Sequence, residues 1–396
     1  MKKILFVYPS MILGGSTTAL LSLMNSLDSK KYQIDLQLMS NSGPLFDYIP
    51  KHVNILSPAD KYPSRVGKII KRIRFVFQGA VIKAFLVNLK NKKIGFSSDI
   101  ITSFSAKHLS KKNAKKYDFA IGFLEGWSDW YLAYNVNATK KYGWLHSTFA
   151  NITTDPNSQL PWMKRVDKIV FVTEACASAF KKTLASMADK TIVIENITDS
   201  EIIKKRSELI DKNDESYVFF RSADCFKIVT VCRIDINTKG LDRIVNCAKK
   251  LKENNINFLW CIIGNGKDEE MLRSMIGEAN VEDVLIPIGV RLNPYPFIKE
   301  ADIMCMPSRY EGKPIVVTES MILGVPPVVT NYLSANDQIQ NGVDGIVVEN
   351  NDIAIMDAVF NCSCNKEYVQ EMKFNITSNE YGNMKYVKKI ESELLW

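Results

Sequence analysis

The sequence predicts an α/β fold with two doubly wound, Rossmann-like domains facing a central cleft, and three observations favour it. The chain has 396 residues, whereas single domains usually have roughly 100–200. A strand-like run, a glycine loop and a helix-like run follow one another twice, starting near Lys2 and near Phe226. In both halves, short apolar runs alternate with longer periodic segments, the pattern of parallel strands joined by crossover helices.

The first half is expected to form an N-terminal domain, 1–198. Residues 2–8 are β-branched and aromatic and predict a strand, Gly14 and Gly15 mark the loop after it, and 19–24 have helical spacing. Further apolar runs predict strands at 119–123, 142–145, 169–172 and 192–194.

The second half is expected to form a C-terminal domain, 225–379. Residues 226–231 predict its first strand and Gly240 opens a helical run. Further apolar runs predict strands at 258–263, 284–286, 303–306 and 327–329. The polar stretch 199–224 lacks a strand signal and is expected to be a linker. The segment 380–396 has helical spacing and is expected to form a helix that packs back on the N-terminal domain.

The composition is that of an ordinary globular protein, with 46% hydrophobic and 24% charged residues, which excludes disordered and fibrous classes. No run of about 18 apolar residues occurs, and the first apolar run soon turns polar, so neither a membrane span nor a signal peptide is expected. All eight cysteines follow residue 175, several of them in apolar runs (Cys232, Cys261 and Cys305), which favours reduced thiols and a cytoplasmic location. Cys362 and Cys364 lack a second ligand pair, and no Asp-x-Asp occurs, so neither a metal nor another cofactor is expected.

Basic residues gather in the segment 61–116. It holds fifteen Lys or Arg residues and one acid, Asp99, interleaved with apolar runs. Such a segment suits an amphipathic helix on an anionic membrane surface, and the alternative is a solvated helix face. Nucleic acid is not expected as a partner, because no recognised binding module accompanies the charge.

The segment 308–320 is the richest in candidate functional residues. It follows a predicted strand, and Pro314 suits the first position of a helix, which places Glu311 in the preceding loop and Glu319 in the second helical turn. A loop and a helix N-terminus offer amides for phosphate, and a carboxylate can accept two ribose hydroxyls. The alternative is a surface helix with an acidic start.

This segment resembles the signature of the retaining family 4 (group 1) glycosyltransferases, which have the GT-B fold. The resemblance rests on Glu311 and Glu319 with seven residues between them, the Glu-Gly-x-Pro run and the Gly-Val-Pro sequence at 324–326. Upstream, Arg233 and Lys239 resemble the pair that contacts the donor diphosphate, residues 262–266 resemble the Gly-x-Gly turn, and 286–290 resemble the strand that enters the base-binding loop. These motifs cover about residues 228–348. In the first half, Gly14, Gly15 and the Trp-Leu-His run at 144–146 match more loosely.

The resemblance implies a metal-independent hexosyl transfer from a UDP- or GDP-linked sugar to a saccharide or lipid-linked saccharide, in bacterial-type surface polysaccharide synthesis. It assigns ribose to Glu319 and the transferred sugar to Glu311, while Arg233 and Lys239 stabilise the leaving diphosphate. The expected catalytic residues are Glu311, His146, Arg233 and Lys239. The expected donor-binding residues are Gly14, Gly15, Arg233, Lys239, Gly264, Gly266, Val290, Glu311, Gly312, Lys313, Pro314, Ile315 and Glu319.

Three alternatives stay open at this point. His146 ends an apolar run and could have a purely structural role. An NAD-type oxidoreductase is suggested by Asp35, twenty residues after Gly15, although the loop lacks the spaced three-glycine pattern. A catalytically silent nucleotide-sugar-binding protein would share the donor motifs.

Overall fold

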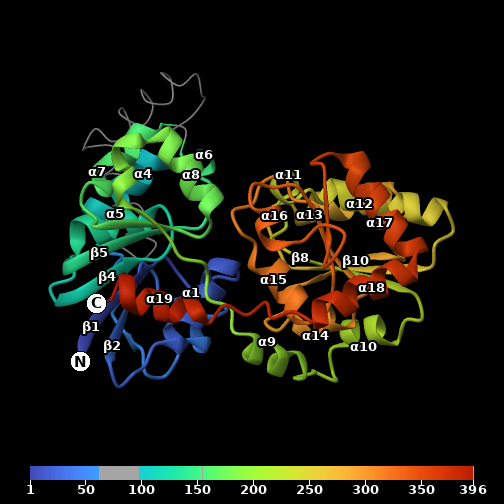
Figure 1. The fold of residues 1–396 in the computed structure, drawn as a ribbon, viewed down its shortest axis with the longest axis horizontal. Helices are drawn as coiled ribbons and strands as arrows, with labels where there is room; N and C mark the ends of the chain where they lie inside the picture. The colour runs from blue at the N-terminus through green and yellow to red at the C-terminus, as the bar shows by residue number, and fades with distance from the viewer. Residues whose placement is uncertain (62–97, 154, 396) are drawn as a thin grey trace. The chain divides into compact units, whose positions relative to one another are not determined.

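The computed structural model describes residues 1–61, 98–153 and 155–395. The chain divides into two compact units, Met1–Ile197 with Lys385–Trp396, and Thr198–Met384. Each unit is an α/β domain built on its own parallel sheet (Figure 1). Most of the basic segment 61–116, for which a membrane surface was predicted as partner, lies outside the described residues.

The first unit contains a seven-stranded parallel sheet in the order β3-β2-β1-β4-β5-β6-β7. The chain runs outward from β1 to β3, then returns to the other side of β1 and continues to β7, so the switch point lies between β1 and β4. In register, Leu5 of β1 lies between Asp35 of β2 and Ala120 of β4. The strands are β1 (Lys2–Tyr8), β2 (Tyr32–Leu38), β3 (Asn54–Ile55), β4 (Lys116–Gly122), β5 (Asn137–Leu145), β6 (Lys168–Phe171) and β7 (Thr191–Val193).

The helices of the first unit supply large aromatic side chains to its core. Leu5 and Val7 of β1 pack in one cluster with Trp130, Trp162 and Phe180. Because side chains alternate along a strand, the neighbouring residues of β1 face the opposite side. The helical elements are α1 (Gly15–Ser26), η1 (Phe46–Tyr48), α4 (Ser98–Phe104), η2 (Ser105–Leu109), α5 (Trp127–Asn135), α6 (Phe149–Ile152), η3 (Pro156–Gln159), α7 (Leu160–Met163), α8 (Glu174–Thr183), η4 (Ala185–Lys190) and α19 (Lys385–Glu393).

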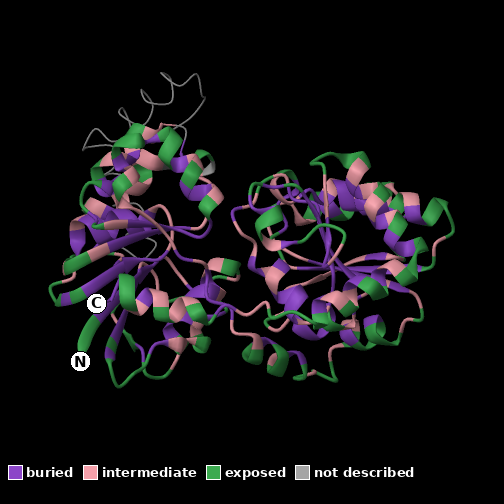
Figure 2. Cartoon of the chain, viewed as in Figure 1, coloured by how far each residue is buried: buried purple, intermediate pink, exposed green. Residues whose placement is uncertain are grey.

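The second unit contains a six-stranded parallel sheet in the order β10-β9-β8-β11-β12-β13, with its switch point between β8 and β11. Ile228 and Val229 are neighbours in β8 but belong to two different hydrophobic clusters, so both faces of the sheet are covered. Figure 2 shows the buried strands between helices whose outer sides are exposed. The strands are β8 (Phe226–Val231), β9 (Phe258–Ile263), β10 (Leu285–Gly289), β11 (Ile303–Met306), β12 (Pro327–Thr330) and β13 (Ile346–Val348).

Two sets of helices cover this sheet, one on each face. Helices α12, α13 and α17 contribute to one cluster, and α9, α10, α14 and α15 contribute to the other. The helices are α9 (Ser200–Ser207), α10 (Glu215–Ser222), α11 (Ile236–Lys239), α12 (Leu241–Glu253), α13 (Glu269–Glu278), α14 (Tyr295–Glu300), α15 (Ile315–Ile322), α16 (Ala335–Gln338), α17 (Asp352–Cys364) and α18 (Lys366–Thr377). The predicted α/β fold with two doubly wound domains is confirmed.

The stretch 199–224, expected to be a linker, instead holds the helices α9 and α10. Asp199 and Asp214 cap their N-termini by accepting hydrogen bonds from backbone N–H groups. Ile203, Tyr217 and Phe220 are buried in the second unit. Most other residues of both helices are polar or charged, so these few buried apolar residues gave no clear pattern in the sequence.

The C-terminal helix α19 belongs to the first unit. Tyr142 of β5 donates a hydrogen bond to the carbonyl of Leu394 at 2.6 Å, and Lys2 of β1 donates to the carbonyl of Leu395 at 3.1 Å. Ile390 is fully buried. Contacts between residues far apart in sequence therefore attach α19, together with the residues directly after it, to the sheet of the first unit.

The eight cysteines are free thiols. Burial raises the pKa of Cys232, Cys247 and Cys261 to about 12, so these thiols are poor nucleophiles. Over the described ranges, no helix is both long and apolar enough to cross a membrane.

Candidate functional site

Most of the predicted site residues lie at one edge of the second unit's sheet. Arg233 and Lys239 follow β8, and Glu311 follows β11. These two strands flank the switch point, where the loops after neighbouring parallel strands diverge and leave space for a ligand. The fold therefore brings together two segments that are more than 70 residues apart.

Lys239 and Glu311 form an ion pair at this switch point. The Lys239 Nζ lies 2.5 Å from the Glu311 Oε1, and the two side chains are only 18% and 11% exposed. Ser308 donates a second hydrogen bond to the same oxygen at 2.7 Å. The Glu311 Oε2 accepts no hydrogen bond from the residues that the structure describes, so it is available to a ligand hydroxyl.

The backbone around Lys239 explains how this residue reaches the end of β11. Asp235 caps the short helix α11 by accepting a hydrogen bond from the Thr238 amide at 3.2 Å. Gly240 then adopts a left-handed conformation with φ of 66°. A Cβ at Gly240 would lie 2.2 Å from the Pro307 carbonyl oxygen, so only glycine permits this approach to β11.

Arg233 lies at the same edge but is much more exposed, with 67% of its side chain accessible. Its guanidinium lies 3.7 Å from the Asp235 carboxylate, which also lies 3.4 Å from Lys267. The pair of cations predicted to contact a diphosphate thus consists of one enclosed lysine and one exposed arginine.

Gly264 and Gly266, which were predicted to form a turn, follow β9 and lie against the loop after β8. A Cβ at Gly264 would lie 1.9 Å from the Cys232 carbonyl oxygen, and one at Gly266 would lie 2.0 Å from that of Ile234. The Gly264 amide donates to the Gly289 carbonyl at 2.9 Å, which ties in the end of β10 just before Val290. The loops after β8, β9 and β10 are therefore held together as one surface.

The loop before α15 differs from the prediction by one residue. Pro314 is the N-cap, with ψ of 120°, and Ile315 is the first helical residue. The extended ψ of Pro314 excludes it from the helix. Ser334 donates a hydrogen bond to the Gly312 carbonyl, and Gln338 donates one to the Pro314 carbonyl at 3.1 Å, which fixes the loop on either side of Lys313.

Glu319 lies in the second turn of α15 and is buried, with 7% exposure. Burial raises its pKa, while the hydrogen bond from Tyr295 and the charge of Arg206 oppose the shift. The Tyr295 hydroxyl donates to the Glu319 Oε1 at 2.7 Å, and the Arg206 guanidinium lies 4.8 Å from the centre of the Tyr295 ring. No hydrogen bond to the Glu319 Oε2 comes from the described residues.

Sequence reasoning missed Ser308, Tyr295 and Arg206 as neighbours of the two glutamates. Ser308 begins the segment 308–320 but was not singled out, although a hydroxyl three residues before Glu311 is in reach of it. Arg206 was hidden because it lies in the stretch taken for a linker. No local signal marks Tyr295, because its relation to Glu319 exists only in the folded chain.

His146 follows β5 in the first unit, where its main hydrogen-bonding partners are a carboxylate and a carbonyl. Its amide donates to the Glu125 Oε2 at 2.9 Å, and its Nε2 lies 3.0 Å from the Phe123 carbonyl oxygen. Burial lowers the pKa of His146, while the charge of Glu125 and the Phe123 carbonyl oppose the shift. Its Nδ1 is buried without a partner among the described residues. A neutral imidazole that donates through Nε2 fits these contacts.

Glu125 was also missed, although an acid two residues after the apolar run 119–123 is a detectable signal. Ser147 donates a hydrogen bond to its Oε1 at 2.6 Å, so Glu125, which follows β4, is held by two residues that follow β5. Gly14, the N-cap of α1, and Gly15, its first residue, are exposed. A Cβ at Gly14 would meet no atom of the described residues within 4 Å, so packing against them does not require glycine there.

The acid that suggested an oxidoreductase does not lie at a ligand-binding edge. Asp35 is in the middle of β2 and 3% exposed. Burial acts to raise its pKa, but hydrogen bonds from Asn54, Tyr117 and Lys115 lower it overall. Because three donors already hold its carboxylate, Asp35 is a structural residue of the sheet.

Potential metal ligands do not gather anywhere in the described part of the chain: no group of three or more His, Cys, Asp or Glu side chains is placed to hold an ion. The charged groups of the site are the cations of Arg233 and Lys239 and the carboxylates of Glu311 and Glu319. The carboxylates accept hydrogen bonds from hydroxyl and ammonium groups. Such a set suits a phosphate and sugar ligand better than a bare cation.

Comparison with known proteins places residues 212–389 with the family described as "Glycosyl transferases group 1". An uncharacterised glycosyltransferase of Haemophilus influenzae is 24% identical over 388 residues, which cover 95% of each chain. The Escherichia coli UDP-Gal:alpha-D-GlcNAc-diphosphoundecaprenol alpha-1,3-galactosyltransferase is 26% identical over 216 residues, which are 54% of this chain and 51% of that protein.

Solved structures match the whole chain at low sequence identity. HepE of Anabaena, in complex with UDP and glucose, superposes with a TM-score of 0.67 at 14% identity over 100% of this chain and 99% of that one. WaaG, a glycosyltransferase involved in lipopolysaccharide biosynthesis, has a TM-score of 0.66 at 12% identity, and 99% of each chain is covered. At this identity the likeness concerns the fold.

Proposed function

We propose that this protein, which has the GT-B fold and whose residues 212–389 match the group 1 glycosyltransferase family, transfers a hexosyl unit from a UDP- or GDP-linked sugar with retention of the anomeric configuration. The acceptor is a saccharide or lipid-linked saccharide of a surface polysaccharide. Two relatives support this substrate class: the Escherichia coli galactosyltransferase named above and a Staphylococcus aureus capsular polysaccharide glycosyltransferase that is 26% identical over 178 residues.

The observation that carries the proposal is the Lys239–Glu311 pair at the switch point of the second sheet. A nucleotide diphosphate that binds there attracts Lys239 and Arg233, and the Glu311 carboxylate is then free to accept hydroxyls of the transferred sugar. Cleavage of the sugar–phosphate bond builds negative charge on the diphosphate. Two cations placed beside it stabilise that charge, which is the role a metal has in other transferases.

Glu319 is proposed to hold the donor ribose. Its Oε1 is occupied by Tyr295, and its Oε2 is left for a hydroxyl donor. Because Tyr295 is itself buried, it fixes the carboxylate in one orientation before any ligand binds. The two glutamates thus have separate roles, one toward the ribose and one toward the sugar.

Single substitutions should separate these roles. Glu319→Ala should weaken UDP or GDP binding about tenfold or more, the cost of losing a charged hydrogen bond. Glu311→Ala should leave nucleotide affinity within a few-fold and chiefly lower kcat, and Lys239→Ala should lower kcat/KM by about 10²-fold or more. Calorimetry with each nucleotide and turnover measured with the matching nucleotide-sugar check this, with the exposed Glu282→Ala as control. Normal turnover in the first two variants would refute the assignment.

Two measurements test the mechanism. We expect activity to persist in EDTA, since Arg233 and Lys239 supply the positive charge. We also expect the product's anomeric configuration to match that of the donor in an NMR spectrum, and an inverted linkage would rule out the retaining mechanism.

We also propose that the enzyme works in the cytoplasm at the inner face of a membrane, where lipid-linked saccharides are extended. The support is the basic, apolar segment 61–116. Flotation with anionic liposomes, compared with neutral ones, tests this. Equal flotation with both kinds of liposome would contradict it.

A further inference from the structure

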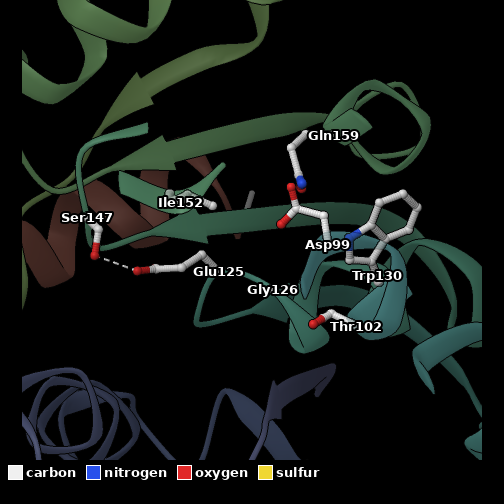
Figure 3. Close-up of a pocket in the computed structure, with 8 residues that line it drawn as sticks. All are labelled: Asp99, Thr102, Glu125, Gly126, Trp130, Ser147, Ile152 and Gln159. Carbon is white, nitrogen blue, oxygen red and sulfur yellow. Dashed lines mark hydrogen bonds between the residues drawn. The ribbon is translucent and has the colours of Figure 1, made fainter. Parts of the chain in front are cut away.

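A cavity of about 270 Å³ opens in the first unit beside the ends of β4 and β5 (Figure 3). Its volume is close to the lower end of small-molecule sites, roughly 300–1,000 Å³, so it suits one small ligand or one sugar ring. The cavity lies at the carboxyl edge of the sheet, close to the switch point between β1 and β4. The lining residues come from loops and helices: Asp99, Thr102, Glu125, Gly126, Trp130, Ser147, Ile152 and Gln159.

Two carboxylates are fixed in this lining before any ligand binds. The Asp99 Oδ2 accepts hydrogen bonds from Thr153 at 2.6 Å and Ser158 at 3.3 Å. The Glu125 carboxylate accepts from Ser147 at 2.6 Å and from the His146 amide at 2.9 Å. Neutral groups make all four bonds, and neither acid forms an ion pair with a cation in the described ranges.

The remaining lining combines an aromatic ring with uncharged polar groups. Figure 3 shows Asp99, Trp130 and Gln159 grouped on one side of the cavity and Glu125 with Ser147 on the other. The Lys107 ammonium lies 4.3 Å from the centre of the Trp130 ring and does not line the cavity. The Trp130 indole N–H makes no hydrogen bond within the described residues, so it remains a donor for a ligand. Carboxylates, an amide and an aromatic surface match the hydroxyls and C–H faces of a sugar.

We propose that this cavity binds the acceptor's terminal sugar and selects a neutral or amino sugar over an acidic one. The inference rests on the proposed function, because it takes the ligand to be the saccharide acceptor of that reaction. Sugar hydroxyls donate to Asp99 and Glu125, and the ammonium of an amino sugar gains a further attraction to them. The carboxylate of a uronic acid or the phosphate of a phosphorylated sugar meets two negative charges and no cation of the lining.

Binding of matched methyl glycosides to the full chain tests the proposal. The probes are methyl glucoside, methyl 2-amino-2-deoxyglucoside and methyl glucuronide, with the corresponding galactose series, followed by ligand-observed NMR. We expect the uronides to bind at least about tenfold more weakly than their neutral partners, the effect of a modest charge repulsion. Asp99→Asn and Glu125→Gln should each reduce this difference in affinity between uronides and neutral glycosides.

The exposed Asp189→Asn removes the same charge from the same unit and should leave the difference unchanged. Thermal unfolding shows which variants are folded, and Ser147→Ala, which removes a neutral donor, serves as a second variant of the site. Equal binding of uronides and neutral glycosides, or a difference that both acid variants leave intact, overturns the inference.

The outcome separates this inference from the proposed function. If UDP and GDP fail to bind and no sugar is transferred while the glycoside preference depends on Asp99 and Glu125, the proposed function fails and the cavity's role as a sugar site stands. If transfer proceeds to acidic acceptors and is indifferent to both substitutions, the enzyme function stands and this inference fails.

Discussion

Lys239 and Glu311 form an enclosed ion pair whose energetics suit the ligand-binding role proposed for them. An enclosed ion pair gains attraction but loses the hydration of both groups, so its net contribution to folding is small. Ser308 offsets part of that cost by donating to the carboxylate. In the proposed reaction, a diphosphate that attracts Lys239 would therefore break an interaction of little net stability, so the exchange of partners costs little.

Asp129 of α5 is the most unfavourably placed acid in the first unit. It is 0% exposed, and neither carboxylate oxygen has a hydrogen-bond partner in the described part of the chain. Burial raises its pKa well above the ordinary value of 3.8, and the charge of Glu125 raises it further. A Cβ at Gly143 would lie 2.9 Å from its Oδ1, so a glycine in β5 leaves room for this group.

Asp129→Asn should therefore stabilise the protein at neutral pH. A raised pKa means that the folded state binds more protons than the unfolded state, so stability is full below the ordinary pKa and falls as pH rises toward the folded one. We expect the substitution to add roughly 1–3 kcal/mol near pH 7, because the Asn amide does not ionise and so removes the pH-dependent cost of burying an acid, and less toward pH 4. Chemical denaturation at several pH values measures this. An equal gain from the exposed Asp189→Asn would show that net charge, not burial, is responsible.

At the scale of elements, the candidate donor site depends on how closely three loops approach one another. Gly264 has φ of 144° and its absent side chain leaves space for the Cys232 carbonyl. For Gly277, in the helix α13, a Cβ would lie more than 4 Å from every neighbouring atom in the described part of the chain. Packing thus requires glycine at position 264 but not at position 277, so a substitution at Gly277 is a control for the same substitution at Gly264 in the same unit.

Gly264→Ala should lower the free energy of unfolding by roughly 1–3 kcal/mol and weaken nucleotide binding, because the β8 and β9 loops must separate. Gly277→Ala should raise stability by roughly 0.5–1 kcal/mol, since it favours the helix. Denaturant titration and calorimetry with UDP or GDP measure both effects. A Gly264→Ala protein with unchanged stability and affinity would contradict this account of the turn.

At the scale of the whole molecule, the C-terminal helix α19 completes the unit that begins the chain. Ile390 and Leu394 are buried there, although they are separated from β1 by nearly the full sequence. The stability of the first sheet is therefore expected to depend on residues that follow the second unit.

Ile390→Ala should destabilise the first unit by about 2–5 kcal/mol, the usual cost of truncating a buried isoleucine. Hydrogen exchange should increase in β1 and β5 and remain unchanged in β8 and β9. Lys388→Ala, an exposed neighbour on the same helix, is the control and should have little effect. Faster exchange in the second unit alone would show that α19 does not act on the first sheet.

The sequence by itself determined the α/β class, the two sheets and most of the candidate functional site at one sheet edge. Strand periodicity and glycine loops depend on local geometry, and Glu311, Glu319, Arg233 and Lys239 lie in short motifs that can be recognised without a fold. Local signals failed where contacts are long-range. The stretch 199–224 appeared polar because Ile203, Tyr217 and Phe220 are too few to give a clear period.

Only the tertiary structure decided which side chains face one another. It paired Lys239 with Glu311, placed Tyr295 on Glu319, and assigned Asp35 to the interior of a strand. It also assembled Asp99, Glu125 and Trp130 around one cavity. The physical reason is that strand order and helix packing determine distances between residues remote in the chain, and one sequence read along its length contains no measure of those distances.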